Sequence, residues 1–362
     1  MSEQVRHVAV IGAGISGLAT LRNLLSTKQK YIPTCFERGS DLGGVWLYNE
    51  NTHVDEYGMP VFSSIYRDLI SNLPKPLMEF PGFQNTDPDI ASSFMHREEV
   101  MEYIKRFSAH YDLEKHIKTH AYVTDVSPKS AERFPEWTVS YQDVRNKEMK
   151  HDVFDAIFLS HTHDKLKSAL PENVIEKTGI KRMTRTTVVF LDDTEEEVDV
   201  LLFCTGYCYS FPFLSDDVIN VSRDKITPLY KHVVNVKHPN LLFIGILERV
   251  SYFPMAHVMS RFAVAVLDGD VMLPSEMEMQ EYVDRDFEKR EARGDKPHKF
   301  TKNERLWEYD KDLSTLAGIQ PSPKAFELVR AFIIQEYTHN VTTFRDRKIQ
   351  ISEDRKSFQL LN

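Results

Sequence analysis

The stretch VAVIGAGISGLATL, residues 8–21, decides the fold of this chain. It reads as a short apolar strand, a glycine-rich turn and the start of a helix, and another apolar run, YIPTCFE, follows at 31–37. Because short apolar runs bounded by turn signals indicate strands, this order predicts strands at 7–11 and 31–37 with a helix at 17–26 between them. The stretch is therefore a βαβ unit, in which a helix joins two parallel strands.

Three glycines in the turn, Gly12, Gly14 and Gly17, have the spacing G-x-G-x-x-G. In dinucleotide-binding turns the first glycine permits the tight turn, the second lets a pyrophosphate approach the backbone, and the third lets helix and strand pack closely. The free N–H groups and the positive dipole end of the helix then face the phosphates. The motif alone also fits an ordinary tight turn. The candidate phosphate-binding residues are Gly12, Ala13, Gly14, Ile15, Ser16 and Gly17.

Glu37 supplies the context that separates these two interpretations. It lies 20 residues after Gly17, at the end of the second predicted strand. A carboxylate at this place accepts hydrogen bonds from the ribose hydroxyls of an adenosine. The alternative is a solvated strand end. Together with the complete βαβ unit, Glu37 favours a dinucleotide site, and the neighbouring Arg38 is a further candidate binding residue.

The segment ERGSDLGGVWLY, residues 37–48, favours a flavin over a nicotinamide dinucleotide. Gly43 and Gly44 predict a second turn that lets the backbone approach a ligand closely. Trp46 offers a flat apolar wall against which an isoalloxazine ring can be shielded from water. The alternative is a surface loop with a buried tryptophan.

Further along the chain, a loop-rich stretch at 39–89 precedes a predicted helix at 96–111. That helix has apolar residues at Val100, Tyr103, Ile104 and Phe107, which share one face. More strands are expected at 121–126, 137–141, 154–160, 188–191, 198–204 and 240–246, a helix from 261, and a mostly polar, helical pattern from 276 to the end.

Composition narrows the class of protein. The 362 residues carry a net charge of −9, which argues against a nucleic-acid partner. No run approaches the length of a membrane span, and no secretory signal is recognised at the N-terminus. Three scattered cysteines, Cys35, Cys204 and Cys208, form no disulfide framework and favour a reducing compartment. We expect a cytoplasmic protein, and the sequence makes no prediction of its oligomeric state.

Five segments, taken in order, resemble the flavin-containing monooxygenases, especially insect members that N-oxygenate amines. They are GAGISG (12–17), FERGSDLGGVW (36–46), YRDLISNLPKPLMEFPGF (66–83), FDAIFLS (154–160) and FCTGYCYSFPFL (203–214). The similarity covers most of residues 5–270. The resemblance implies an α/β, Rossmann-like FAD/NAD(P)-binding fold. It also implies NADPH-driven oxygenation of small nucleophiles, such as amines and sulfides, by dioxygen on a bound FAD.

The resemblance also implies roles for single residues. Asn72, in a Ser–Asn pair, is expected to stabilise the oxygenated flavin and to contact the nicotinamide cofactor. It is the one catalytic candidate, because a flavin carries the chemistry while the protein supplies position and dryness. The implied FAD-binding residues are Gly12, Gly14, Gly17, Glu37, Gly44, Val45, Trp46, Ser71, Asn72, Val123, Thr205 and Gly206.

The sequence departs from that family where a second glycine motif, for NADPH, is expected. None of the 14 glycines completes a second G-x-G-x-x-G for NADPH, and the family's F-x-G-x-x-x-H signature is absent. We therefore expect a truncated second nucleotide region, with FAD binding a firmer prediction than NADPH binding. The predicted organisation is 1–160 and 203–270 as two parts of an FAD-binding domain, 161–202 as the remnant of an NADPH-binding region, and 271–362 as a mostly helical C-terminal segment.

Two alternatives to an active monooxygenase stay open. The first is a catalytically impaired FAD-binding isoform, because the second glycine turn is missing. Lys181, Arg182 and Arg185 in the remnant could meet a 2′-phosphate, but they fit a solvated basic edge better. The second is a metal-dependent hydrolase built on the HTHD run at 161–164. That run lacks the further His and Asp ligands that such a site needs, so no metal site is predicted.

Overall fold

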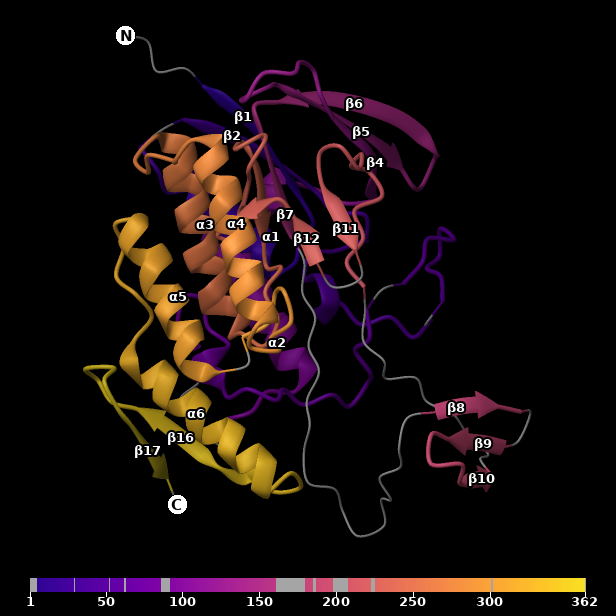
Figure 1. Ribbon diagram of the computed structural model, residues 1–362, viewed down its shortest axis with the longest axis vertical. Coiled ribbons are helices and arrows are strands. Elements are labelled where there is room, and N and C mark those ends of the chain that lie inside the picture. Colours follow the sequence, from indigo (N-terminus) through magenta and orange to yellow (C-terminus); the bar gives the residue numbers. More distant parts are fainter. Residues whose placement is uncertain are drawn as a thin grey trace.

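A computed structural model describes residues 5–28, 30–51, 53–61, 63–85, 92–160, 180–184, 187–197, 208–222, 225–300 and 302–361. Its centre is a seven-stranded sheet with the order β13-β14-β15-β7-β1-β2-β3 (Figure 1). The neighbours β15, β7, β1, β2 and β3 run parallel, and β13 and β14 add an antiparallel edge. The bounds are β1 Arg6–Ile11, β2 Tyr31–Phe36, β3 Ile117–Lys118, β7 Ala156–Ser160, β13 Leu229–Tyr230, β14 Val234–Asn235 and β15 Leu241–Ile244.

Both faces of the sheet are covered, which is why Val8–Val10 of β1 and all of β15 are apolar and buried. Side chains alternate between two cores, as the period of two of a strand requires. In β1, Val8 and Val10 enter the core under the helices, whereas Ala9 enters the core on the opposite face. In β15, Leu242 faces the first core and Phe243 the second.

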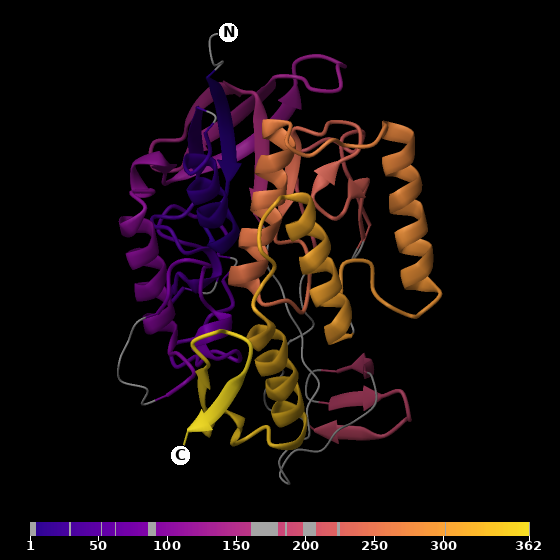
Figure 2. The same ribbon diagram turned by 90° about the vertical axis from the view of Figure 1, so that its left-hand side faces the viewer.

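Helices cover one face of the sheet. The helix α1, Ile15–Leu25, packs against α3, Tyr252–Asp268, which in turn packs against α5, Asn303–Leu316 (Figures 1 and 2). The helix α2, Arg97–His110, buries the predicted stripe in the same core. The helix α3 begins nine residues before the expected start at 261, because Pro254 lies in its first turn, where a proline is tolerated.

An antiparallel sheet covers the opposite face. It has the order β4-β5-β6, with β4 at Ala121–Pro128, β5 at Trp137–Asp143 and β6 at Glu148–Phe154. Trp137, fully buried, and the segment 209–219 fill the space between the two sheets. The strand β6 was not predicted, because its sequence EMKHDVF is charged and only one of its faces is covered.

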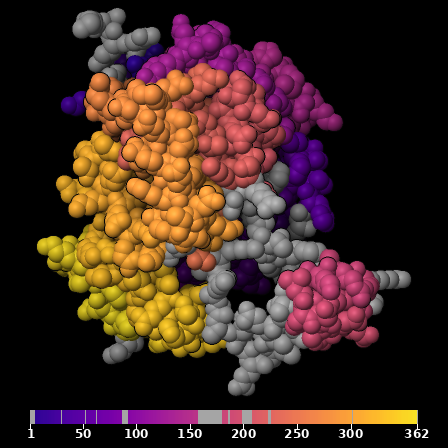
Figure 3. All heavy atoms as spheres, viewed as in Figure 1, coloured from indigo at the N-terminus to yellow at the C-terminus, as the bar shows by residue number. Residues whose placement is uncertain are grey.

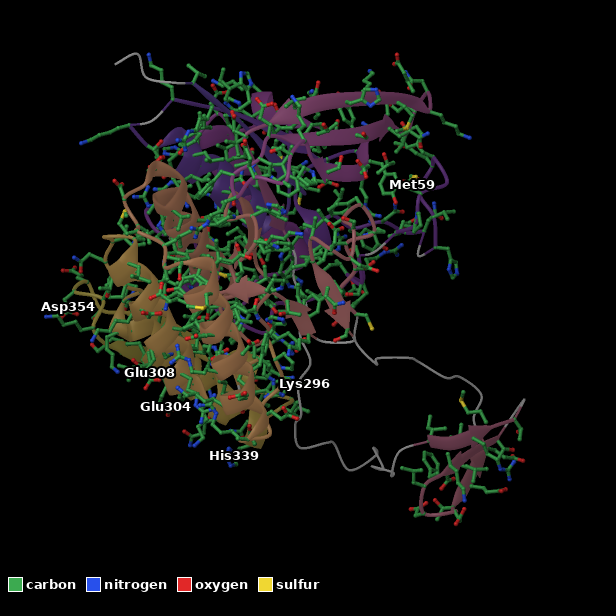
Figure 4. The ribbon with its side chains drawn as sticks, turned by 45° about the horizontal axis from the view of Figure 1, so that its top comes forward. Met59, Lys296, Glu304, Glu308, His339 and Asp354 are labelled. Carbon is green, nitrogen blue, oxygen red and sulfur yellow. The ribbon has the colours of Figure 1, made fainter. Side chains whose placement is uncertain are left out.

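The C-terminal region is helical at first, as expected, with α4 at Glu276–Glu291, α5 and α6 at Lys324–His339. These helices lie on one face of the molecule (Figure 3), and Glu304, Glu308 and His339 lie on its outer surface (Figure 4). The chain then ends in a hairpin of β16, Lys348–Ile351, and β17, Phe358–Leu361, which the helical expectation missed.

Two smaller sheets complete the described part of the chain. A hairpin joins β11, Asn220–Ser222, to β12, Lys225–Thr227. A three-stranded sheet of β8, Ile180–Met183, β9, Thr187–Phe190, and β10, Glu195–Glu197, lies apart from the main body (Figures 1 and 4). In the ranges given above, no helix has both the length and the apolar character needed to cross a membrane. The short 3₁₀ turns are η1 Gly44–Trp46, η2 Lys75–Leu77, η3 Glu114–His116 and η4 Phe344–Asp346.

Candidate functional site

The glycine turn joins the carboxyl end of β1 to α1. Gly12 has a φ of 97°, which glycine adopts without strain, and its N–H donates to Phe36 O at 2.8 Å. A Cβ on Gly17 would lie 1.8 Å from Gly12 O, so the third glycine is required for the turn to close against the helix. Gly14 is the N-cap residue of α1 and has no side chain to cap it. The first N–H groups of α1 are therefore placed to meet an anion.

Glu37 follows β2 and ties this turn to the next loop. Its Oε2 accepts from Ala13 N at 2.9 Å and its Oε1 accepts from Gly39 N at 2.8 Å. A carboxylate offers about four acceptor positions, so both oxygens can still accept from another donor. Glu37 therefore braces the turn and keeps acceptor capacity for ribose hydroxyls.

A cavity of about 180 Å³ opens beside Glu37. Arg38 lines it, and burial lowers the pKa of this guanidinium despite the opposing effect of Glu37. The predicted Val123 lies on the opposite strand, β4, whose start is held because Ala121 N donates to Glu37 O at 2.9 Å. The full lining is Ile11, Gly12, Phe36, Glu37, Arg38, Ala121, Tyr122, Val123, Ser210, Phe211 and Phe213.

Sequence reasoning missed several of these lining residues. Ser210 and Phe211 belong to the segment FCTGYCYSFPFL, in which only Thr205 and Gly206 were selected. The hydroxyl of Tyr209 donates to Ile246 O at 2.6 Å and so anchors this segment after β15. The aromatic run in this segment could have indicated Phe211 and Phe213. Tyr122 could not be linked to them, because its strand lies far away in the chain. Thr205 and Gly206 themselves lie outside the described residues.

The second glycine turn lies directly against the first. Gly43 N donates to Ala13 O at 2.9 Å, and a Cβ on Gly44 would lie 2.9 Å from the Cα of Gly14. Gly43 and Gly44 have φ values of 119° and 58°, which also favour glycine. Two backbone turns can therefore meet here without side chains between them. Gly44 is exposed beside the half-exposed Gly12 and Gly14, which leaves a polar backbone surface accessible.

Val45 and Trp46 follow in η1. Trp46 is partly buried and packs against the helical core, so one face of its ring is already covered. The Val45 carbonyl accepts from the Ser63 hydroxyl at 2.6 Å, which fixes η1 against the next loop. Both residues thus lie immediately beyond the paired glycines, where the resemblance expects the flavin ring.

Ser71 and Asn72 differ in burial and in their contacts. Ser71 is buried, and its hydroxyl donates to Leu73 O at 2.9 Å and accepts from Met95 N at 3.0 Å. These bonds within the protein make Ser71 a support of the loop. Asn72 is exposed and free to face a ligand.

Other predicted groups bear on the alternatives. Lys181 pairs with Asp193 at 2.5 Å and Arg182 pairs with Glu195 at 3.3 Å, both within the exposed β8–β10 sheet. Arg185 and the HTHD run at 161–164 lie outside the described residues, and among the described ones no three His, Cys, Asp or Glu side chains gather around a metal position.

A glycine-rich turn between a parallel strand and a helix, beside a cavity, is the arrangement of Rossmann-like nucleotide-binding folds, and comparison with known proteins narrows the class. The family described as flavin-binding monooxygenase-like matches residues 5–176 and 162–331. The chain therefore belongs to this family of flavin-dependent monooxygenases.

Individual relatives agree with this assignment. Senecionine N-oxygenase of Tyria jacobaeae is 25% identical, with 96% of this chain and 90% of that protein covered. Trimethylamine monooxygenase of Pelagibacter ubique (strain HTCC1002) is 28% identical, with 94% and 92% covered.

Solved structures share the fold. S-allyl-L-cysteine S-oxygenase from Allium sativum superposes with a TM-score of 0.82 and 26% identity, over 96% of each chain. Tmm from Pelagibacter sp. strain HTCC7211 superposes with a TM-score of 0.78 and 23% identity, over 97% of this chain and 95% of that one. The α/β Rossmann-like prediction is therefore confirmed.

Proposed function

We propose that this chain binds FAD at the site described above and uses NADPH and dioxygen to oxygenate the nitrogen or sulfur of small nucleophiles. The observation that carries this proposal is the cavity beside Glu37, which opens next to two glycine turns in backbone contact. The uncapped start of α1, the spare acceptor positions of Glu37 and the absence of side chains at the turns all suit an adenosine diphosphate half.

Each part of the site has a distinct task in this proposal. The N–H groups of the first turn and of α1 bind the pyrophosphate, and Glu37 binds the ribose. Val123 and Tyr122 line the adenine side of the cavity. Trp46 excludes water from one side of the flavin ring, and Asn72 presents its amide to the ring edge. The chemistry that a bound flavin supplies is activation of dioxygen and transfer of one oxygen atom to a soft nucleophile.

The substrate class rests on the relatives. Their names include an N-oxygenase, a trimethylamine monooxygenase and an S-oxygenase. Amine nitrogens and sulfide sulfurs share a lone pair that can accept an electrophilic oxygen. A small tertiary amine or a small sulfide is therefore the proposed substrate.

A second candidate function, an FAD-binding isoform impaired in turnover, is favoured by the length of the chain. Because 96% of 362 residues is about 348 residues, roughly 73 positions of the 421-residue alignment with the senecionine N-oxygenase have no residue in this chain. The family match also breaks into two segments that meet around residue 170. Both observations support the proposed division into FAD-binding parts at 1–160 and 203–270 and a shortened NADPH region at 161–202.

Anaerobic reduction of the full chain separates these two candidates. After reconstitution with FAD, the flavin band at ~450 nm is followed on mixing with NADPH, and then with dithionite as a chemical reductant. The active enzyme is expected to lose the band with NADPH and, once air is admitted, to convert trimethylamine or dimethyl sulfide to its oxide. The impaired isoform loses the band only with dithionite.

A further inference from the structure

The C-terminal arm, which we define as residues 322–361, lies against the loop that carries Asn72. Figure 2 shows its hairpin beside the segments 65–85 and 92–95, although more than 250 residues separate them in sequence. A separate apolar cluster joins the two and contains Leu77, Phe94, Phe326, Val329, Ile333, Phe344 and Ile349. Ile349 N also donates to the buried Ser93 hydroxyl at 2.7 Å. The arm is therefore a packed wall behind this loop.

Arg345 of the arm donates hydrogen bonds to the two backbone carbonyls that precede Asn72. Its Nε donates to Ser71 O at 3.0 Å, and its Nη2 donates to Ile70 O at 3.5 Å. The guanidinium lies 4.5 Å from the centre of the Phe344 ring, and Phe344 is fully buried. Stacking on a fixed ring holds the planar guanidinium in one orientation.

The bonded carbonyl matters because of its place in the chain. Ser71 O belongs to the peptide unit whose nitrogen is that of Asn72, and this unit is planar. A donor that fixes the carbonyl therefore fixes the direction in which the chain enters Asn72. On the other side, Ser71 N donates to Met95 O at 2.8 Å. The backbone of Ser71, which leads into Asn72, is thus held from two directions, while Asn72 itself is exposed.

We propose that Arg345 is a positioning residue that orients Asn72 toward the bound flavin. This inference rests on the proposed function, because the proposed function places Asn72 at the flavin. The inference gives the C-terminal arm a part in the oxygenation site, through a charged donor to the peptide that precedes Asn72.

Hydrogen exchange tests the positioning without any cofactor. Amide exchange is measured by mass spectrometry on peptides that cover 69–73 and 93–96, for the wild type and for Arg345→Met. Removal of two hydrogen bonds from a charged donor is expected to speed exchange there by roughly tenfold. The matched control is Arg347→Met, because Arg347 lies on the same arm but pairs with Glu336 at 2.6 Å. Unchanged exchange in Arg345→Met overturns the proposal.

Reoxidation of the flavin tests whether the effect acts through Asn72. The FAD-loaded protein is reduced with dithionite and mixed with air-saturated buffer, and the return of the ~450 nm band is timed. Arg345→Met and Asn72→Ala are each expected to speed this return by roughly tenfold. The double variant is expected to be no faster than Asn72→Ala alone, and Arg345→Lys to lie between wild type and Arg345→Met.

Two outcomes of this second test overturn the proposal. One is an Arg345→Met rate equal to that of the wild type. The other is an equal acceleration by Arg345→Met in the Asn72→Ala background, which indicates a structural effect independent of Asn72. Failure of the proposed function looks different, since no flavin band forms in the wild type, and the exchange measurement still decides whether Arg345 positions the loop.

Discussion

Gly17 and Glu37 illustrate how single residues create the nucleotide site. Neither donates a group to chemistry. Gly17 matters through the Cβ that it lacks, because the Gly12 carbonyl occupies that position. Glu37 matters through two backbone bonds that hold the turn open at the cavity. Both effects can be tested by small substitutions.

Gly17→Ala is expected to lower both stability and FAD affinity. The added Cβ would lie 1.8 Å from Gly12 O, so the turn must move away from the helix. Forcing an extra methyl group into a packed site costs about 1–3 kcal/mol. The free energy of unfolding and the FAD dissociation constant measure the effect. The exposed Gly58→Ala is the control for FAD affinity, since no heavy atom lies within 4 Å of its Cβ position, although its φ of 78° strains an added side chain and costs some stability. A Gly17→Ala variant that melts and binds FAD like the wild type contradicts this account of the turn.

Glu37→Gln is expected to weaken FAD binding by about 10- to 100-fold. The amide replaces one acceptor oxygen by a donor, so either Ala13 N or Gly39 N loses its partner and the ribose loses a charged acceptor, at about 1.5–3 kcal/mol. Quenching of flavin fluorescence on titration measures the affinity. Glu50→Gln, an exposed carboxylate paired with Arg67, serves as control. Equal affinities for the two variants would show that Glu37 does not face the ribose.

Two neighbouring elements depend on a buried histidine pair. His232 follows β13, and His298 precedes α5; their Nδ1 atoms lie 3.1 Å apart. His298 Nε2 accepts from Ile226 N at 2.9 Å, so the neutral His298 carries its proton on Nδ1 and donates to His232. His232 Nε2 lies 3.4 Å from Asp286 Oδ2 and 3.1 Å from Arg290 Nη2, and both of these residues belong to α4. This chain of bonds joins α4 to the sheet edge and uses both rings in their neutral form.

Stability is expected to fall as the pH drops below 6.5. Burial, the largest effect, lowers the pKa of His232 and His298 below the ordinary 6.5, and the neighbouring Arg290 lowers both further, against the opposing effect of Asp286. The unfolded chain then binds more protons than the folded one below pH 6.5, so acid favours unfolding. Each histidine that stays neutral in the folded chain contributes a loss of up to about 1.4 kcal/mol for each pH unit below 6.5.

Urea unfolding at pH 7 and pH 5 measures this dependence. His298→Gln keeps an acceptor for Ile226 N but does not titrate, so it is expected to flatten the pH dependence. The exposed His339→Gln is the control and keeps the wild-type slope. If His298→Gln has the same slope as the wild type, the buried pair is not the source.

At the scale of elements, the helices and strands whose signals lie within one short stretch of sequence were predicted correctly. The first βαβ unit and α2 fall within two residues of their expected bounds, because their apolar periods and turn residues lie within one stretch. The hairpin β16–β17 was missed although KIQI alternates in polarity, since a charged neighbourhood masked the pattern. In the site, the supporting role of Ser71 could not be predicted, because its hydroxyl accepts a hydrogen bond from Met95 N, which lies 24 residues further along the chain. Contacts between distant segments are not visible in a local pattern.

At the scale of the whole molecule, the β8–β10 sheet bears on NADPH. Its two described cations, Lys181 and Arg182, already pair with acidic side chains on the same sheet. We expect the Lys181→Ala/Arg182→Ala variant to keep the preference of the wild type for NADPH over NADH, within about twofold, because exposed ion pairs contribute only about 0–1 kcal/mol. Concentrations of each nucleotide that half-protect the chain from proteolysis measure this. A selective loss of NADPH protection would assign these cations to the 2′-phosphate instead.

The most direct test of the central claim is a comparison of FAD with FMN. The cavity beside Glu37 and the first glycine turn bind the adenosine diphosphate half in this account, and FMN lacks the adenosine. Titration of the flavin-free full chain, followed by flavin fluorescence, is predicted to show one FAD bound per chain and at least about 100-fold weaker FMN. Equal binding of FMN and FAD, or no binding of FAD, would contradict the account.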